Sequence, residues 1–575
     1  MFVGIDLGTS TSEIAFLNSD GKPEVIPNLD GELTTPSAVY INEDNEPVVG
    51  MAALNMNLSE PESTFIEVKR QMGRDKVLKA RGVQYTPAKI SSFILRYLVD
   101  CAEAYLNEKV DRAVITVPAY FTDRQRRDTI KAGELAGIEV ERIINEPTAA
   151  ALDYSAENPN EAKSILVYDL GGGTLDVTVL ELYDGAMDVK SSCGNNSLGG
   201  KDFDELLMNR ILKKIQEKHR VNLARDIAVV SKLKRLSEEC KKHLSSNLEY
   251  EATLPFLFKN KNNPVGYEEK ITRKEFEQLI QSAVSSTFVQ IETALSEAGI
   301  RAQNIDMVLL VGGSTRIPLV SRLLMDALDF EPRKFVDPDL AVVRGAAIQT
   351  GIIEGSLRKG KAIILTDVCP YSLSTEVLSG FTPHPRLLCD ILIKRNSTIP
   401  ATISKIYYTC YDDQDTVEIK AFQGESEERA ENVFLDKFLL RGIPKSKAGH
   451  EKIKVFFSYD LNGILTVGAE CVSNGVSKSI SINTSNSGKA EQIEDIAPGG
   501  ASVESWTDSR SAGNYKTLIS RAEKIVDSVG DDAPEAVKSL MNAVEELKRG
   551  LVLGLGEDDL EDLKDGVLDA IGELS

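Results

Sequence analysis

"DLGGGTLD", residues 169–176, lies between two apolar runs in the middle of this 575-residue chain. Three consecutive glycines stand between two aspartates. A Walker loop needs Lys and then Ser or Thr after its last glycine, and a dinucleotide-binding loop needs its glycines to open a helix. Here the glycines lead into "LDVTVLEL" (175–182), whose alternating apolar residues predict a strand. We therefore expect a β-hairpin turn, in which backbone N–H groups approach phosphate oxygens without a Cβ in the way.

The same plan occurs near the N-terminus. "GIDLGTSTSEIAF" (4–16) and "YDLGGGTLDVTVL" (168–180) both run from an apolar strand ending in Asp, through a Gly/Thr turn, into a second strand. Further buried strands are predicted at 112–121 and 306–318, with a helical pattern at 123–137. This alternation predicts an α/β domain of two related halves of roughly 180 residues each. A helix-rich insert is expected at about 204–300.

The pattern changes near residue 355. From 368 to about 486 the chain is a series of short strands separated by turn residues, which predicts a β-sandwich of roughly 120 residues. "DLNG" (460–463) predicts a hairpin between two of these strands. A Gly/Ser/Asp-rich stretch then leads to a predicted helical tail. One face of that tail carries Leu540, Val544, Leu547 and Leu551.

Composition excludes several functional classes. The net charge of −22 argues against binding nucleic acid or anionic lipid. Seven scattered cysteines without a CxxC pair, and four histidines, indicate reduced thiols and argue against a transition-metal centre. No apolar run approaches the ~20 residues that a membrane-spanning helix needs. The first strand begins at residue 2 without a basic leader, so we expect a cytoplasmic protein.

Two hairpins facing each other would hold a triphosphate from both sides. Asp6 and Asp169 would then end the two central strands at the same depth. Carboxylates in that position suit Mg²⁺, which keeps most of its waters and uses few protein ligands. With "VGGST" (311–315) as a third loop, the two copies favour nucleotide binding over plain structural hairpins.

These motifs carry a family resemblance. The duplicated hairpins resemble those of the actin/hexokinase/heat-shock ATPase superfamily. The chain as a whole is similar to the DnaK-type 70-kilodalton heat-shock chaperones, and "TDVCPYSL" and the reduced tail are closer to the HscC-like specialised branch. The matching stretches are "GIDLGT", "VPAYFTDRQR", "INEPTAAALDY", "DLGGGTLDV", "LGGKDFD", "VGGSTRIPLV", "LTDVCPYSL", "IPATISKIYYT" and "FQGE".

The resemblance implies a multidomain fold. Its parts are an α/β actin-like ATPase domain of the duplicated ribonuclease-H-like type (1–358), an interdomain linker (359–367), a β-sandwich that binds peptides (368–488) and a short acidic helical lid and tail (489–575). It implies an ATPase that acts as an ATP-dependent chaperone in protein folding and the stress response. The implied cofactors are ATP or ADP and Mg²⁺, with K⁺ as a further candidate.

The resemblance also implies roles for the residues of the nucleotide site. Lys69 would neutralise the γ-phosphate and orient the attacking water, while Glu146 and Asp176 would shape the water network and sense the γ-phosphate. Asp6 and Asp169 would hold Mg²⁺ through water. The remaining nucleotide-binding residues would be Gly8, Thr9, Ser10, Thr11, Gly171, Gly172, Gly173, Thr174, Gly199, Gly200, Glu238, Lys241, Lys242, Ser245, Gly312, Gly313, Ser314, Arg316 and Asp339.

For the sandwich, the resemblance implies a pocket for one side chain of an extended apolar peptide. The pocket residues carried over are Thr375, Leu378, Tyr407, Cys410, Val417 and Ile419. Thr375 stands where the family usually has an aliphatic residue and Tyr407 adds a hydroxyl, so a more polar pocket is expected.

Coupling residues are implied as well: Pro118, Arg126, Ile363, Ile364, Leu365 and Asp367. From the sequence alone, Pro118 is a strand-ending proline and Arg126 a helix-surface arginine. Thr366 replaces an apolar linker residue, and we expect it to weaken docking of the linker on the ATPase domain.

Three other functional classes fit these residues less well. A metabolite kinase or an actin-like filament protein leaves the sandwich unexplained, and a non-hydrolysing regulator is disfavoured by the presence of Lys69, Asp6, Asp169 and Glu146. The implied partners are unfolded or extended polypeptides, a J-domain co-chaperone and a candidate nucleotide-exchange factor. The shortened tail predicts fast peptide exchange.

Overall fold

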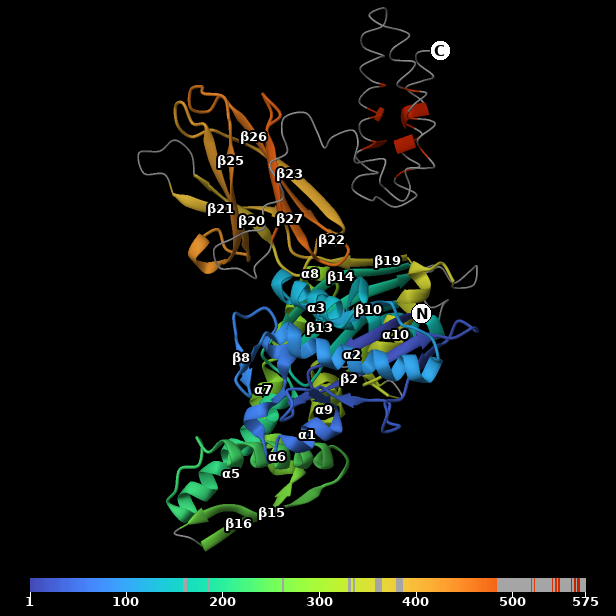
Figure 1. Cartoon of the computed structure of the whole chain (residues 1–575), viewed down its shortest axis with the longest axis vertical. Helices are drawn as coiled ribbons and strands as arrows, with labels where there is room; N and C mark the ends of the chain where they lie inside the picture. Colours follow the sequence, from blue (N-terminus) through green and yellow to red (C-terminus); the bar gives the residue numbers. More distant parts are fainter. Residues whose placement is uncertain are drawn as a thin grey trace, which may run out of the picture.

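Figure 1 shows the computed structural model of the chain. The structure describes residues 1–158, 163–183, 186–260, 263–328, 332–334, 337–356, 364–378 and 386–482, and isolated positions between 515 and 568. An α/β region forms the middle of the view, a β-sandwich lies above it, and a helical and hairpin region extends below. Within the described residues, no helix is long and apolar enough to cross a membrane.

The first hairpin lies in a sheet with the strand order β11-β10-β1-β2-β3, and β4 also pairs with β2. β1 (Phe2–Leu7) is buried along its whole length, because both faces of the sheet are covered. β10 runs parallel to β1, and β2 antiparallel to it. The other strands are β2 (Thr11–Leu17), β3 (Pro23–Val25), β4 (Thr35–Pro36), β10 (Arg112–Val117) and β11 (Glu139–Asn145).

The second hairpin repeats this topology. Its sheet has the order β18-β17-β12-β13-β14, continued by β19 and β22. β12 pairs antiparallel with β13 and parallel with β17, as β1 does with β2 and β10. The two predicted halves are therefore confirmed strand by strand. The strands are β12 (Lys163–Leu170), β13 (Leu175–Tyr183), β14 (Ala186–Asn195), β17 (Met307–Val311), β18 (Arg333–Lys334), β19 (Ile364–Val368) and β22 (Thr398–Ile399).

Two helices at equivalent places in the repeat join the halves. α4 (Glu146–Glu157) follows β11, and α10 (Ala341–Ile353) follows β18. They pack against each other, and α10 also packs on β1 and β2. A Cβ on Gly345 would lie 1.8 Å from the carbonyl oxygen of Ala149, so this close crossing requires glycine.

The first half carries a smaller sheet, β6-β5-β7, a hairpin, β8-β9, and three helices. α3 occupies the predicted helical segment and begins with a capping box, in which Thr122 and Gln125 satisfy each other's backbone N–H groups. These elements are β5 (Ala38–Ile41), β6 (Pro47–Val49), β7 (Thr64–Ile66), β8 (Leu78–Ala80), β9 (Val83–Tyr85), α1 (Met51–Met56), α2 (Pro87–Leu106) and α3 (Asp123–Leu135).

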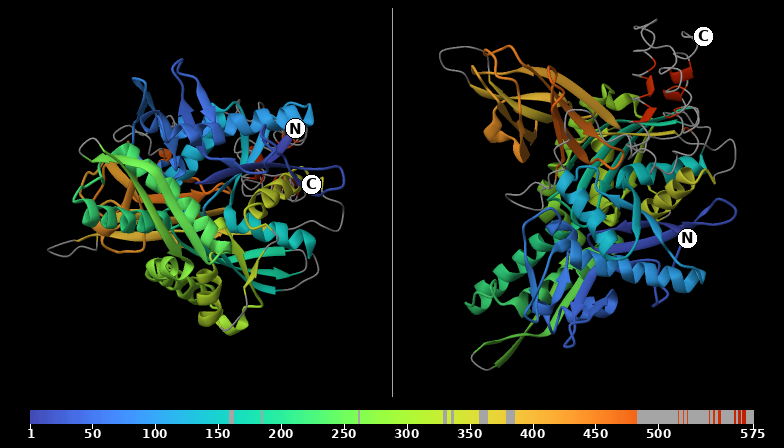
Figure 2. Two further views of the ribbon diagram at one scale, coloured as in Figure 1. Left: turned by 90° about the horizontal axis from the view of Figure 1, so that it is seen from below. Right: turned by 45° about the horizontal axis from the view of Figure 1, so that its top comes forward.

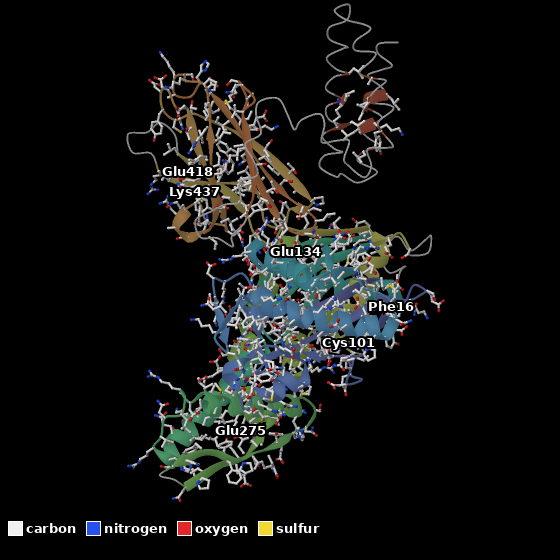
Figure 3. All side chains as sticks on the ribbon, viewed as in Figure 1. Phe16, Cys101, Glu134, Glu275, Glu418 and Lys437 are labelled. Atoms are coloured by element: carbon white, nitrogen blue, oxygen red, sulfur yellow. The ribbon has the colours of Figure 1, made fainter. Side chains whose placement is uncertain are left out.

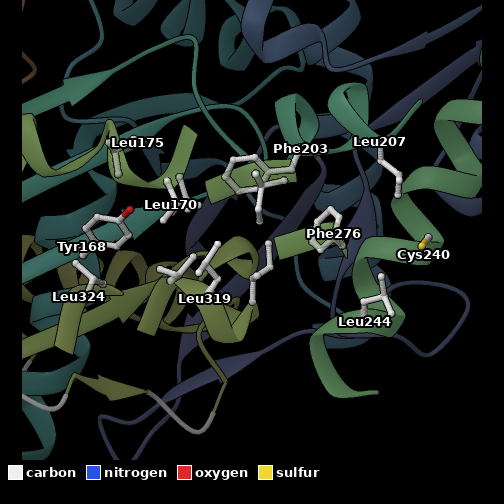
Figure 4. Packing of buried hydrophobic residues seen from close by; sticks show 14 of the residues in the cluster. Tyr168, Leu170, Leu175, Phe203, Leu207, Cys240, Leu244, Phe276, Leu319 and Leu324 are labelled. Carbon is white, nitrogen blue, oxygen red and sulfur yellow. The ribbon is translucent and has the colours of Figure 1, made fainter. Parts of the chain in front are cut away.

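The insert of the second half contains a long hairpin besides the predicted helices. Its elements are α5 (Gly200–His219), α6 (Ile227–Ser246), β15 (Glu249–Asn260), β16 (Asn263–Thr272), α7 (Arg273–Ser285) and α8 (Phe288–Ala298), with α9 (Pro318–Leu328) following β17. Figure 2 shows this hairpin from two further sides. Figure 4 shows the shared core, where Tyr168 and Leu170 of the second hairpin lie near Phe203 of α5 and Leu319 of α9.

The predicted sandwich consists of two sheets around one core. "DLNG" forms the predicted hairpin turn between β26 and β27. One sheet has the order β21 (Leu387–Ile393), β20 (Leu373–Leu378), β24 (Thr416–Gln423) and β25 (Val433–Arg441). The other has the order β23 (Ala401–Tyr408), β26 (Lys452–Tyr459), β27 (Leu465–Cys471) and β28 (Ser477–Ser481).

In the tail, Leu540, Val544 and Leu547 are buried in one cluster, as the sequence predicts for one helix face. Leu551, the fourth predicted member, lies outside the described residues. All seven cysteines are free thiols, and all except Cys410 are buried, which agrees with the absence of a disulfide pattern in the sequence.

Candidate nucleotide site and its connection to the sandwich

The turns of the two repeated hairpins lie against each other. A Cβ on Gly172 would come within 2.3 Å of Ser10 Oγ, and one on Gly173 within 3.0 Å of Thr9 Oγ1. The facing arrangement expected from the sequence is therefore present. It gathers the turn residues Gly8, Thr9, Ser10, Thr11, Gly171, Gly172, Gly173 and Thr174 into one place.

Two further loops close around the second turn. At the start of α5, the amide of Gly200 donates to the carbonyl of Gly171 (3.0 Å), and a Cβ on Gly199 would meet the Gly173 amide at 2.5 Å. In the loop after β17, Ser314 Oγ donates to the same Gly171 carbonyl (2.8 Å). Three loops therefore meet around the second turn, and their glycines leave the backbone N–H groups accessible. Accessible N–H groups are what a phosphate-binding site requires.

Buried charges lie at the ends of the two central strands. Lys69 forms a buried ion pair with Glu146, the first residue of α4. Asp6 accepts a hydrogen bond from Thr116 Oγ1 (2.7 Å), and Asp169 lies at the corresponding position of the second half. Asp176 Oδ1 accepts from the amide of Tyr120 (3.0 Å), whereas its buried Oδ2 has no hydrogen-bond partner within the described part of the chain.

The site has an excess of negative charge, because Lys69 lies among the four carboxylates of Asp6, Glu146, Asp169 and Asp176. Burial, with the nearby Glu146 carboxylate, raises the pKa of Asp6 and that of Asp176 to about 7. Burial and the same neighbour raise the pKa of Asp169 well above its usual value. A bound cation would relieve this repulsion. A magnesium ion, which keeps most of its waters and needs few direct protein ligands, would fit beside these carboxylates.

This charge imbalance predicts a pH effect on the nucleotide-free protein. Because the pKa of Asp176 is raised, the folded state keeps a proton that the unfolded chain loses above roughly pH 4, so this group costs stability progressively between about pH 4 and pH 7. We expect Asp176→Asn to raise the melting temperature by several degrees at pH 8 but little at pH 5. Thermal melts at both pH values test this, with the exposed Asp44→Asn as control. Equal shifts at both pH values would contradict it.

The predicted adenosine residues lie on α6, except those of the loop after β17. Lys241 is buried, and its Nζ donates to Asp204 Oδ2 (2.8 Å) and to the Gly200 carbonyl (2.9 Å). Burial opposes ionisation of Glu238, but Lys201 and Lys242 outweigh it and lower the Glu238 pKa to about 2. α6 therefore presents fixed charges toward the turns.

The other residues predicted to bind adenosine make contacts that lie within α6 or around the loop after β17. Ser245 Oγ donates to the Lys241 carbonyl within the helix (3.0 Å). Arg316 forms an ion pair with Asp339 (2.9 Å). A Cβ on Gly313 would lie 2.9 Å from Oδ1 of the same aspartate. At Gly312 φ is +80°, and a Cβ there would meet Asp169 Oδ1 at 2.7 Å.

Three charged residues of this site were not predicted from the sequence: Arg70, Lys201 and Asp204. Arg70 donates to the Gly173 carbonyl (3.0 Å) and pairs with Asp202 (2.5 Å), so it links the first half to the second turn. Lys201 and Asp204 hold Glu238 and Lys241. Arg70 directly follows Lys69, and Lys201 and Asp204 lie in "LGGKDFD", so the motifs contained the signal. A cleft joins these groups to the turns and is lined by Thr9, Ser10, Arg70, Lys201, Asp204 and Glu238, among others.

The α/β region is connected to the sandwich through buried polar groups. Arg126 is 3% exposed, so its interpretation as a helix-surface arginine is wrong. It donates to Asn145 Oδ1 (2.7 Å), and Asn145 Nδ2 donates to Asp367 Oδ2 (2.8 Å). Arg126 also donates to the carbonyls of Ala119 and Phe121, just after the strand-ending Pro118. The predicted coupling residues Pro118, Arg126 and Asp367 therefore lie together.

The described part of the predicted linker, from residue 364, belongs to β19, a strand of the second sheet. Leu365 and Thr366 in β19 pair in parallel register with Met187 and Asp188 in β14, and Asp367 pairs with Ile399 in β22. Thr366 Oγ1 donates to Asp188 Oδ1 (2.5 Å). The Thr366 hydroxyl therefore has a partner in this arrangement, and the expectation that it weakens docking relative to an apolar residue stays a prediction. Ile363 and the side chain of Ile364 lie outside the described residues.

Further contacts between the two regions were not predicted. The Leu465 amide donates to Asp123 Oδ1 (2.9 Å), and the Ile143 amide donates to Asn462 Oδ1 (2.9 Å). Tyr371 Oη donates to the carbonyl of Tyr120 (2.8 Å), the residue whose amide binds Asp176. These contacts pair residues more than 200 positions apart, so no local sequence signal points to them.

The predicted peptide-pocket residues are divided among three strands and a loop. Thr375 and Leu378 lie on β20, Val417 and Ile419 on β24, and Tyr407 on β23. Ile419 is part of the sandwich core, with Tyr407 and Val417 packed against it. Thr375 Oγ1 donates to the Lys420 carbonyl (2.8 Å). Cys410, just after β23, is half-buried.

Fold and site together define a class: an α/β protein with a duplicated glycine-rich hairpin over buried carboxylates, joined by a paired linker strand to a β-sandwich. The family model described as "Hsp70 protein" matches residues 2–80 and 75–566. The chain therefore belongs to the Hsp70 family. Members of this family are ATP-dependent chaperones and ATPases that use ATP or ADP with Mg²⁺, and they act on unfolded clients with J-domain co-chaperones. The placement in the HscC-like branch remains a sequence-based prediction.

Proposed function

We propose that nucleotide binding and hydrolysis between the two hairpins control how tightly the sandwich holds extended apolar segments of unfolded proteins. One observation carries this proposal. Glu146, which pairs with Lys69 at the phosphate end, is adjacent to Asn145, which bonds to Asp367 where the linker enters the sandwich. Any change at Glu146 that moves the start of α4 therefore acts on the Asp367 contact.

In the nucleotide site, Mg²⁺ would supply charge neutralisation for the phosphates. Asp6 and Asp169 would orient its waters, and the turns would bind phosphate oxygens through their N–H groups and the Thr9, Thr11 and Thr174 hydroxyls. Asp176 Oδ2, which is buried without a partner in the described residues, is suited to accept a hydrogen bond from the attacking water. Lys69 would hold the γ-phosphate.

We further propose the domain boundaries expected from the sequence: an actin-like ATPase domain (1–358), a linker (359–367), a peptide-binding sandwich (368–488) and a short lid and tail (489–575). A J-domain co-chaperone and an exchange factor would be its partners. The stress response and a cytoplasmic location remain sequence-based predictions. Most of the tail lies outside the described residues.

The proposal is tested by asking which compounds stimulate ATP turnover. We expect an extended peptide with an apolar centre to raise the steady-state rate several-fold and ATP to speed release of that peptide. A sugar or polyol should have no effect, because nothing in the proposal gives it a site. Stimulation by a sugar and not by peptides would favour the metabolite-kinase alternative and overturn the proposal.

A further inference from the structure

The proposed peptide pocket contains a carboxylate. Asp390 lies on β21 directly opposite Thr375 of β20 in an antiparallel pair, and side chains at opposed positions point to the same face of a sheet. Thr375 is one of the predicted pocket residues. Asp390 therefore faces the same side of the sheet as the pocket.

A second predicted pocket residue reaches the same carboxylate. Tyr407 Oη donates to Asp390 Oδ2 (2.8 Å), and Lys405 Nζ donates to Asp390 Oδ1 (2.8 Å) and to the Ile391 carbonyl (2.8 Å). Burial and the bond to Asp390 raise the pKa of Tyr407, so its hydroxyl stays a donor. β21 and β23 are edge strands of different sheets, so these bonds bridge the open side of the sandwich.

An apolar side chain entering between Thr375 and Tyr407 would remove water from this carboxylate without replacing its hydrogen bonds. The Asp390 side chain is 34% exposed, and losing its remaining water offsets part of the stabilisation that burying an apolar side chain contributes. A lysine side chain avoids that cost. Its methylene groups can contact Val417 and Ile419 while its ammonium group takes the place of Lys405 at Asp390.

We propose that this site prefers extended segments that present a lysine to Asp390 over segments that present an aliphatic residue there. The proposal rests on the proposed function, because it concerns the same peptide site. The carboxylates of the two inner strands of this sheet, Glu376 on β20 and Glu418 on β24, do not compete for the peptide. Glu376 and Glu418 pair with Lys420, Arg429 and Lys437, and Glu418 alternates with Val417 and Ile419 and so lies on the other face of β24.

The test uses the full chain with ADP and two labelled extended peptides that differ only at a central lysine or norleucine, which has a similar length and no charge. Fluorescence anisotropy should show the lysine peptide binding about tenfold more tightly to the wild type. Asp390→Asn should reduce that ratio to about twofold or less. Lys405→Met, which removes the competing ammonium group, should increase it.

The matched control is Glu418→Gln, which removes the same charge from the outer face of the sandwich, where Figure 3 labels Glu418 beside Lys437. It should leave the ratio unchanged. Equal or tighter binding of the norleucine peptide by the wild type, or an unchanged ratio in both Asp390→Asn and Lys405→Met, would overturn the inference. If both peptides bind equally and ATP releases both, only this inference fails. If neither binds, or ATP does not affect binding, the proposed function fails with it.

Discussion

Replacing Lys69 with methionine should lower single-turnover ATP hydrolysis by a factor of at least about 100, the size of effect expected when one preorganised charge is removed from a transition state. Lys69 is the buried cation among Asp6, Glu146, Asp169 and Asp176, and its ion pair with Glu146 fixes its position. Without it, charge that develops on the transferred phosphoryl group would face four carboxylates. Hydrolysis is measured with radiolabelled ATP in the presence of Mg²⁺.

The control for this variant is Lys22→Met, an exposed lysine on the same domain, which should keep the wild-type rate. Because Lys69→Met leaves Glu146 buried without its partner, the variant is also expected to melt at a lower temperature. Lys69→Arg keeps the positive charge and separates the two effects, since it should restore stability more than activity. Hydrolysis by Lys69→Met within a factor of three of the wild type would show that Lys69 has no role in the reaction.

The second large effect is expected at the connection between the domains. Asp367→Ala removes the acceptor of Asn145 Nδ2, and the Asp367 carboxylate is 7% exposed, so the lost bonds are not replaced by water at once. One or two hydrogen bonds to a buried carboxylate correspond to about 1.5–3 kcal/mol each. ATP-triggered release of a bound peptide should therefore slow by roughly 10- to 100-fold. Stopped-flow fluorescence of a labelled peptide gives this rate.

Peptide affinity with ADP should stay within about twofold of the wild type in Asp367→Ala, because Asp367 does not lie in the proposed pocket. Asp20→Ala, an exposed acid on the first domain, is the control and should release peptide at the wild-type rate. If Asp367→Ala released peptide normally, the path from Glu146 through Asn145 would not carry the coupling.

Much of the architecture could be predicted because it depends on local patterns. The glycine turns, the alternating strands after them and the repeated order of elements are all visible within short windows. The same is true of the "DLNG" hairpin and of the apolar face at Leu540, Val544 and Leu547. The hairpin β15–β16 was missed within a segment predicted as helix-rich. The alternation along β15 is interrupted at "PFLF" (255–258), where the register with β16 shifts and the apolar Phe256 is exposed.

The site could be predicted only in part. Glycines and acids in motifs were identified, but their partners depend on contacts between distant segments. Arg126 is buried because Asn145 and two carbonyl groups satisfy it, and nothing in the helix that contains it indicates this. The partner of the Thr366 hydroxyl, Asp188, lies 178 positions earlier in the chain, so the sequence around Thr366 does not indicate their hydrogen bond. Asp390 is the fourth residue of β21 and lies 17 positions before Tyr407, which belongs to the other sheet, so no local pattern joins the two.

The pairing of β19 on both sides also limits how this chain can vary in length. Its residues bond to β14 of one domain and β22 of the other, so each position has a fixed partner. Inserting or deleting one residue within β19 would turn every later side chain of the strand to the opposite face and separate Thr366 from Asp188 or Asp367 from Asn145. The number of residues in β19 is therefore as constrained as the identity of its side chains.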